Sequence, residues 1–221
     1  MRINKFIALS TGLSRRAADH IIATGQVTVN NQPASAGQTV SDNDLVRMGH
    51  RILEAPHHTR TVLFHKPTGY VVSRDGQGSQ TIYDILPPDV RDLKPVGRLD
   101  KDSSGLLLLT NDGQLALELT HPRYRKQKTY EIELEKSLHD QDRMSITSKG
   151  IALADGMSRL HLAALDQTGK RWRVTMSEGR NRQIRRTFAA LNYRVLKLHR
   201  TQFGPYRLDK LASGQTKPAD K

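Results

Sequence analysis

The sequence contains no cysteine, which excludes disulfides, thiolate nucleophiles and cysteine-ligated zinc. Aromatic residues make up only 5% of the 221 residues, so extensive base stacking on exposed rings is not expected. The longest run of leucines, Leu106–Leu109, is far shorter than the roughly 18 apolar residues that cross a bilayer. The first residues include Arg, Lys and Asp without a signal-peptide core, so we expect a cytoplasmic protein that does not enter a membrane.

Positive charge is what the sequence has in excess. It carries 35 Lys and Arg against 22 Asp and Glu, a net charge of +13. The segment 170–210 alone holds 12 Lys and Arg against two acidic residues. Such an excess predicts a polyanionic partner, with nucleic acid ahead of an anionic membrane surface because no basic amphipathic anchor is present.

Residues 1–55 predict a small helix-rich module. Ser14 fits the N-cap of a helix over Arg15–Ala23, and Val27–Val29 alternates as a strand does. Asn30–Asn31 tolerates the positive φ of a tight hairpin turn. We therefore expect short helices that lead into a small sheet.

Cations lie near the starts of the expected helices of this module: Arg2, Lys5, Arg15 and Arg16. Positive charge at a helix N-terminus opposes the helix dipole, so a bound anion explains these residues better than helix stability does. A solvated basic face is an equal alternative. The module resembles the S-four RNA-binding domain, and the resemblance implies that these cations bind RNA. The matching residues are Arg2–Phe6, Ser14–Ala18, Gly25, Val27–Asn30 and Asp44.

The rest of the chain predicts one larger domain. Residues 56–60 lack periodicity and predict a linker, residues 61–211 the larger domain, and residues 212–221 a polar, frayed tail. The adjacent His57 and His58 point different ways on most backbones and have no third ligand at a suitable spacing. No metal site is therefore expected.

A buried strand with acids at its start is the central feature of the larger domain. Leu106–Leu109, bounded by turn residues, predicts a strand buried on both faces. Asp100 and Asp102 precede it, where a rigid element could hold a catalytic carboxylate. The alternative is that both are loop acids that cap a turn. Asn111 or Asp112 can cap the helix that follows.

A second strand and a basic helix follow. Lys128–Leu134 alternates strictly and places Tyr130 on the buried face, where a core tyrosine is the plain interpretation. Asn181 fits the cap of a helix that runs to Leu191. The polar face of that helix carries Arg182, Arg185 and Arg186. These arginines repel one another unless RNA phosphates or a protein carboxylate lie among them, and a solvated face is the alternative.

The last strand is predicted over Arg194–Arg200. Its alternation places Leu196 and Leu198 inward. Gly204–Pro205 ends the strand. We expect it to complete the sheet of the larger domain.

With these segments in place, the chain resembles the bacterial ribosomal RNA pseudouridine synthases of the single-site small-subunit and large-subunit family. The matching motifs are Lys66–Gly69, Gly97–Asp100 with Gly105–Gly113, His121–Pro122, Lys128–Tyr130, Glu178–Arg186, Leu198 and Gly204–Pro205. The resemblance implies an α+β fold, with a mixed, mainly antiparallel sheet, flanking helices and a central cleft. It also implies an enzyme that converts uridine to pseudouridine in ribosomal RNA, and the arginine-rich run favours large-subunit RNA.

The resemblance assigns roles to individual residues. It implies that Asp100 is the catalytic aspartate, that Tyr130 stacks on the uracil, and that Arg185 pairs with Asp100. It places Arg98 and Leu198 in the substrate pocket. A further set would bind RNA: Arg2, Lys5, Arg15, Arg16, Lys66, Arg180, Arg182 and Arg186.

The implied reaction detaches uracil from ribose, rotates it and reattaches it through carbon, without a metal or other cofactor. Asp100 would act as a covalent nucleophile or remove a sugar proton to give a glycal, and the sequence leaves both routes open. The expected partner is ribosomal RNA or a pre-ribosomal particle, and a monomer is expected. The alternatives are a non-catalytic ribosome-assembly factor on the same fold, and a glycosylase that releases uracil.

Overall fold

The computed structural model describes residues 1–41, 43–54 and 59–219, and the chain divides into two compact units, Met1–Thr59 and Arg60–Lys221. The histidine pair His57–His58 lies outside the described residues, as does most of the predicted linker. Within the described ranges, no helix is long and apolar enough to cross a membrane. The same ranges hold no group of three or more residues of metal-ligating type placed to bind an ion.

The first unit packs two helices against a small antiparallel sheet. Its elements are α1 (Ile3–Thr11), α2 (Arg15–Ala23), β1 (Val27–Val29), β2 (Gln32–Pro33), β3 (Val46–Met48) and β4 (Arg51–Leu53). The predicted cap is confirmed, because the Ser14 side chain accepts a hydrogen bond from the Ala17 amide at 3.1 Å. The predicted hairpin is confirmed too, since Asn30 and Asn31 adopt positive φ between β1 and β2.

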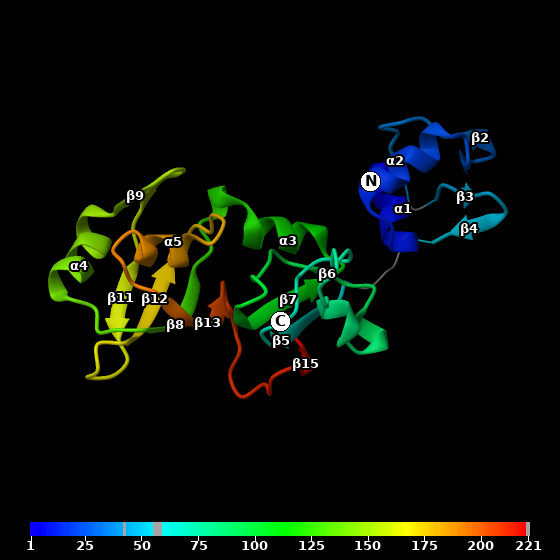
Figure 1. Ribbon diagram of the computed structural model, residues 1–221. Coiled ribbons are helices and arrows are strands. Elements are labelled where there is room, and N and C mark those ends of the chain that lie inside the picture. Colours follow the sequence, from blue (N-terminus) through cyan, green and yellow to red (C-terminus); the bar gives the residue numbers. More distant parts are fainter. Residues whose placement is uncertain (42, 55–58, 220–221) are drawn as a thin grey trace. The chain divides into compact units, whose positions relative to one another are not determined.

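The second unit is built on one large sheet, with strand order β11-β12-β8-β13-β7-β5-β15 (Figure 1). The strands are β5 (Thr61–Lys66), β6 (Lys94–Pro95), β7 (Ser104–Thr110), β8 (Lys128–Leu134), β11 (His161–Ala164), β12 (Arg171–Met176), β13 (Val195–Phe203), β14 (Tyr206–Arg207) and β15 (Thr216–Pro218). Every pair in it is antiparallel except β13 with β7. The predicted α+β class with a mixed, mainly antiparallel sheet is confirmed.

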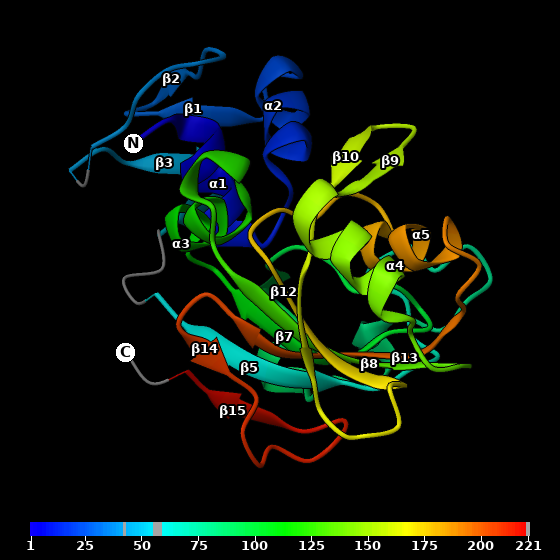
Figure 2. The ribbon, with the colours of Figure 1, turned by 90° about the vertical axis from the view of Figure 1, so that its left-hand side faces the viewer.

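Helices and a hairpin pack around this sheet. They are α3 (Gly113–Thr120), α4 (Asp140–Met144) with its π-helical continuation Ser145–Lys149, α5 (Gln183–Ala189), and the hairpin of β9 (Ile151–Leu153) and β10 (Gly156–Ser158). Figures 1 and 2 show α4 and α5 next to each other. Helix α5 packs in the apolar cluster that contains Leu107 and Leu109, whereas α3 packs through Leu119 in the cluster of Leu106 and Leu108. Short 3₁₀ turns at Ile82–Asp84, Pro88–Val90 and Pro122–Tyr124 complete the unit.

The leucine run forms the centre of the sheet, as predicted. Strand β7 lies between β13 and β5, and each of its four leucines is fully buried. Leu107 and Leu109 join the apolar cluster on one face, while Leu106 and Leu108 join the cluster on the other. Asp112 caps the following helix by accepting the amide hydrogens of the residues at its start. The segment therefore fixes the position of the loop that precedes β7.

Two predictions about the last strands are wrong. Leu196, expected to face inward, is 46% exposed, whereas Val195 is buried. The register against β8 shifts between Val195 and Lys197, and this irregularity reverses the alternation. Residues 216–218 were expected in a frayed tail, but they form β15 and pair with β5.

Gly105 marks a close approach between two strands. Its φ is +108°, and an added Cβ would lie 2.3 Å from the Arg200 carbonyl oxygen and 2.5 Å from its nitrogen. Because both atoms belong to the backbone, the strands would have to separate. We expect Gly105→Ala to lower the free energy of unfolding of the second unit by about 3 kcal/mol.

Urea unfolding followed by the fluorescence of Trp172 tests this expectation, since Trp172 is the single tryptophan and is buried in the second unit. Gly113→Ala is the matched control, because an added Cβ there meets no atom within 4 Å. We expect Gly113→Ala to change stability by less than about 1 kcal/mol. Equal effects from both substitutions would contradict the steric explanation.

Candidate active site

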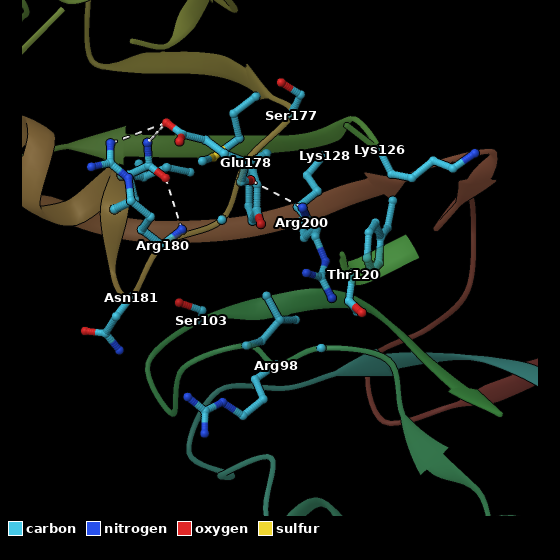
Figure 3. A pocket seen from close by; sticks show the side chains of 18 of the residues that line it. Arg98, Ser103, Thr120, Lys126, Lys128, Ser177, Glu178, Arg180, Asn181 and Arg200 are labelled. Carbon is cyan, nitrogen blue, oxygen red and sulfur yellow. Dashed lines mark hydrogen bonds and ion pairs between the residues drawn. The ribbon is translucent and has the colours of Figure 1, made fainter. Parts of the chain in front are cut away.

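A cleft of about 430 Å³ opens above the middle of the large sheet. One wall is the loop Gly97–Ser103, and a second is the end of α3 with His121 and Pro122. The third wall is the segment 177–184, and strands β8 and β13 form the floor (Figure 3). A volume in this range suits a small ligand or a single nucleotide.

Asp100 lies in the first wall, in the loop between β6 and β7. Its side chain is 32% exposed and lines the cleft. An oxygen of its carboxylate lies 3.4 Å from Nη1 of Arg182. Asp100 is thus a partly buried carboxylate that a ligand in the cleft can reach, with a cation beside it to stabilise its negative charge.

The arginine that pairs with Asp100 is not the predicted one. Arg185 instead donates to the Asp102 carbonyl oxygen at 2.9 Å, lies 3.2 Å from the Asp102 carboxylate, and donates to the Val195 carbonyl at 2.6 Å. Helix α5 starts at Gln183, so Arg182 occupies the N-cap with φ +45° rather than the helix face that carries Arg185. The predicted Asn181 cap is wrong for the same reason.

Asp102 makes more contacts with the arginines of this region than Asp100 does. It accepts two hydrogen bonds from Arg182, both of 3.1 Å, besides its contacts with Arg185. Burial alone would raise the pKa of Asp102, but the hydrogen bond from Arg182 and the charge of Arg185 outweigh it and lower this pKa. In the sequence, these contacts were indicated by two acids separated by one residue and by a run of arginines elsewhere in the chain that could pair with them.

Lys66 was predicted to bind RNA, and the structure corrects this. It is fully buried, and its Nζ donates to the carbonyl oxygens of Pro67, Asp100 and Ser103 at 2.9, 3.1 and 2.8 Å. Burial lowers the pKa of Lys66 to about 8, against the opposing charges of Asp100 and Asp102. Lys66 therefore holds the Asp100 loop against the end of β5.

Tyr130 and Leu198 form part of the cleft floor, on β8 and β13. Each side chain is 8% exposed, and both line the cleft with Ile184. Arg98 also lines it, but its side chain is exposed and extends away from Arg200 (Figure 3). The structure therefore brings the predicted residues Asp100, Tyr130, Leu198 and Arg98 into one cleft.

Two other cations predicted to bind RNA, Arg180 and Arg186, also make contacts within the protein. Arg180 donates to the carbonyl oxygens of Asp155, Gly156 and Met157 at 2.8–2.9 Å. Arg186 binds both oxygens of the Asp155 carboxylate, at 3.1 and 2.7 Å. These contacts fix the turn between β9 and β10, and the part of both arginines in RNA binding stays a prediction.

The cations of the first unit remain accessible. Arg2, Lys5, Arg15 and Arg16 are all exposed. Arg15 donates to the Asn4 side chain at 3.1 Å. Their part in RNA binding stays a prediction.

Comparison with known protein families identifies the two units. A model described as RNA pseudouridylate synthase matches residues 60–190, which is more than half of the chain. The chain belongs to the RNA pseudouridine synthase family. A model described as the S4 domain matches residues 1–46, in agreement with the resemblance of the N-terminal module. The chain is therefore a pseudouridine synthase with an N-terminal domain of this RNA-binding class.

Similar pseudouridine synthases extend over nearly the whole chain. "Ribosomal small subunit pseudouridine synthase A" of Escherichia coli strain K12 is 36% identical and covers 99% of this chain and 96% of its own. "Ribosomal large subunit pseudouridine synthase B" of Bacillus subtilis strain 168 is 33% identical and covers 98% and 91%. A solved structure described as "Crystal structure of pseudouridylate synthase" matches with a TM-score of 0.71 and 32% identity, over 100% of this chain and 96% of that one.

Proposed function

We propose that this synthase converts one uridine of ribosomal RNA to pseudouridine, with Asp100 as the catalytic carboxylate. The observation that carries the proposal is the position of Asp100 in the cleft, beside Arg182 and above a floor that includes Tyr130. A cleft of this size accepts a single nucleotide, so the target uridine must leave its stack before it can react.

The reaction is an isomerisation whose atoms balance without a co-reactant. The bond between uracil N1 and ribose C1′ breaks, the base turns, and a bond forms between C5 and C1′. The proton on C5 leaves, and N1 gains a proton. Asp100 either attacks C1′ or accepts a ribose proton, and both routes need the ionised carboxylate that Arg182 stabilises. Tyr130 offers the detached base an aromatic surface, and Leu198 an apolar one.

The substrate RNA has two candidates. The relative named for the small subunit is 36% identical, and the one named for the large subunit is 33% identical. These names support ribosomal RNA as the substrate, with a slight preference for the small subunit. The preference for large-subunit RNA that the arginine-rich run suggested stays a prediction, as do the monomeric state and the cytoplasmic location.

Tritium release tests the reaction directly. The purified full-length protein is incubated with small-subunit or large-subunit ribosomal RNA transcripts that carry tritium at C5 of uridine. We expect one tritium per RNA chain to reach water, from one of the two transcripts. A binding factor would release none, and a glycosylase would release labelled uracil instead of labelled water; either result would refute the proposal.

The N-terminal domain would add affinity through phosphate contacts. Arg16 is exposed at the start of α2. We expect Arg16→Gln to reduce the slope of log affinity against log salt by about 0.7 for a single-stranded contact. Filter binding at several salt concentrations measures this slope. Arg51→Gln, an exposed site on β4 of the same unit, is the control, and an equal change in both variants would count against a specific contact.

A further inference from the structure

Arg200 is a buried cation with an unused donor on the floor of the cleft. It lies on β13 with 2% of its surface exposed, and it lines the cleft. Its Nε donates to the Leu106 carbonyl oxygen at 2.8 Å. Its Nη2 is buried and has no hydrogen-bond partner among the described residues. An unpaired buried donor is unfavourable, so a ligand acceptor would stabilise it.

The register of the sheet places this donor next to the catalytic residues. Arg200 on β13 lies directly opposite Tyr130 on β8. Residues directly opposite in an antiparallel pair share one face of the sheet, and so do residues two apart on a strand. Arg200 therefore lies on the same face as Tyr130 and Leu198, the face that forms the cleft floor.

Lys128 supplies a second cation at the same end of the cleft. Its Nζ lies 5.2 Å from the centre of the Phe203 ring, and Cζ of Arg200 lies 4.8 Å from the same centre. Figure 3 shows both side chains between Glu178 and Thr120. The Nζ of Lys128 also donates to the Glu178 carbonyl oxygen at 3.3 Å.

In the described part of the chain, neither cation has a carboxylate within ion-pair distance. Among the residues that the structure describes, no ion pair within 4.0 Å is formed by Arg200 or Lys128. Burial, and then the charge of Arg200, lower the pKa of Lys128, and the charge of Glu178 only partly opposes them. Two like charges in a partly buried site repel, and an anion between them removes that repulsion.

We propose that Arg200 and Lys128 form a subsite for one phosphate of the substrate RNA strand, adjacent to the target uridine. The proposal rests on the proposed function, because it places a nucleotide of that RNA in the cleft. A guanidinium offers two parallel donors to phosphate oxygens, and an ammonium offers a point charge. A uracil carbonyl could accept from Nη2, but it would leave two like charges without a counter-ion.

The subsite would position the substrate for Asp100. A phosphate bound at one end of the cleft fixes the adjacent ribose, and the ribose carries the carbon that reacts. The cation pair then supplies part of the binding energy that orients the nucleotide. Arg200 and Lys128 are thus positioning residues, while Asp100 acts on the ribose.

Three small probes test the subsite without turnover: uridine, uridine 5′-monophosphate and uridine 3′-monophosphate. The full chain is labelled with carbon-13 in its lysines, and the Lys128 signal is assigned by its loss in Lys128→Gln. We expect at least one monophosphate to raise the pKa of Lys128, and uridine to leave it unchanged. Which monophosphate acts identifies the side of the uridine on which the phosphate lies.

Substitution of Arg200 provides a second test, which measures the affinity for each probe. Arg200→Gln should weaken binding of the active monophosphate by about tenfold and leave uridine binding unchanged, since a hydrogen bond to a charged group is lost. Lys197→Gln is the matched control on the same strand, because Lys197 is exposed and pairs with Glu133 at 2.7 Å. It should bind every probe as the unmodified protein does.

Two results would overturn the subsite. In the first, uridine raises the pKa of Lys128 as much as the monophosphates do. In the second, Arg200→Gln weakens the binding of uridine as much as that of the monophosphate, which would mean that Nη2 of Arg200 donates to a base carbonyl. If Arg200→Gln does not fold, Lys128→Gln carries the same comparison, because its half-buried side chain makes one backbone hydrogen bond. A protein that prefers the monophosphate but releases no tritium refutes the proposed function alone. One that releases tritium without this preference refutes the subsite alone.

Discussion

Asp100→Asn is expected to reduce the rate of pseudouridine formation by about 10⁴-fold or more. Asparagine keeps the size of the side chain, but it neither attacks ribose C1′ nor accepts a ribose proton. The backbone carbonyl of residue 100 still accepts from Lys66, so the loop should keep its conformation. We therefore expect RNA affinity to change by less than about threefold.

Single-turnover tritium release measures the rate, and filter binding measures the affinity. Asp209→Asn is the control, because Asp209 is exposed and lies outside the cleft. Within the described residues it forms one ion pair, with Lys217 at 3.8 Å. It should react at the unmodified rate. A rate for Asp100→Asn within tenfold of the unmodified protein would show that another group performs the chemistry.

Lys66→Met is expected to disable the enzyme through the loop rather than through the chemistry. Methionine fills most of the buried volume, but it leaves the carbonyl oxygens of Pro67, Asp100 and Ser103 without their donor. We expect a loss of stability of about 3 kcal/mol and a fall in kcat of about 100-fold. Urea unfolding of Trp172 and tritium release measure the two quantities.

Lys101→Met is the matched control. Lys101 is exposed in the same loop, and among the described residues its ammonium donates to one group, the Ser79 hydroxyl, at 3.2 Å. It should cost little stability and little activity. If both lysine variants behave alike, Lys66 does not hold the loop.

The effect of Lys66→Met on stability should also depend on pH. Burial lowers the pKa of Lys66 to about 8 from 10.5, so the unfolded chain binds this proton more tightly than the folded chain does. The unmodified protein should gain stability from this group as pH rises from about 8 to 10.5, and none of that gain should occur in the variant. The difference in unfolding free energy between the two proteins should therefore grow across that window. A constant difference would mean that the pKa of Lys66 is not lowered.

Local features of the fold could be predicted from the sequence. The Ser14 and Asp112 caps depend on hydrogen bonds within three residues, and both form as expected. Strands β7 and β8 were predicted from apolar patterns within seven residues. Because β7 follows Asp100 and β8 carries Tyr130, patterns between residues close in the sequence were enough to predict two sides of the cleft.

The errors come from contacts between distant segments. The exposure of Leu196 follows from a register irregularity against β8, which no pattern within β13 reveals. Lys66 and Arg180 look like surface cations in the sequence, but carbonyl oxygens far along the chain accept from Nζ of Lys66 and from both Nη atoms of Arg180. Arg185 was assigned to Asp100 because both lie in the family motifs, whereas the start of α5 decides which arginine reaches that carboxylate.

The most direct test of Asp100 as the catalytic group in ribosomal RNA modification is a map of pseudouridines in cells that lack the gene. The map should lack one pseudouridine of ribosomal RNA that the parent strain has. The unmodified gene should restore it, and an equally expressed Asp100→Asn gene should not. Restoration by the Asp100→Asn gene, or an unchanged map in the deletion strain, would contradict the assignment.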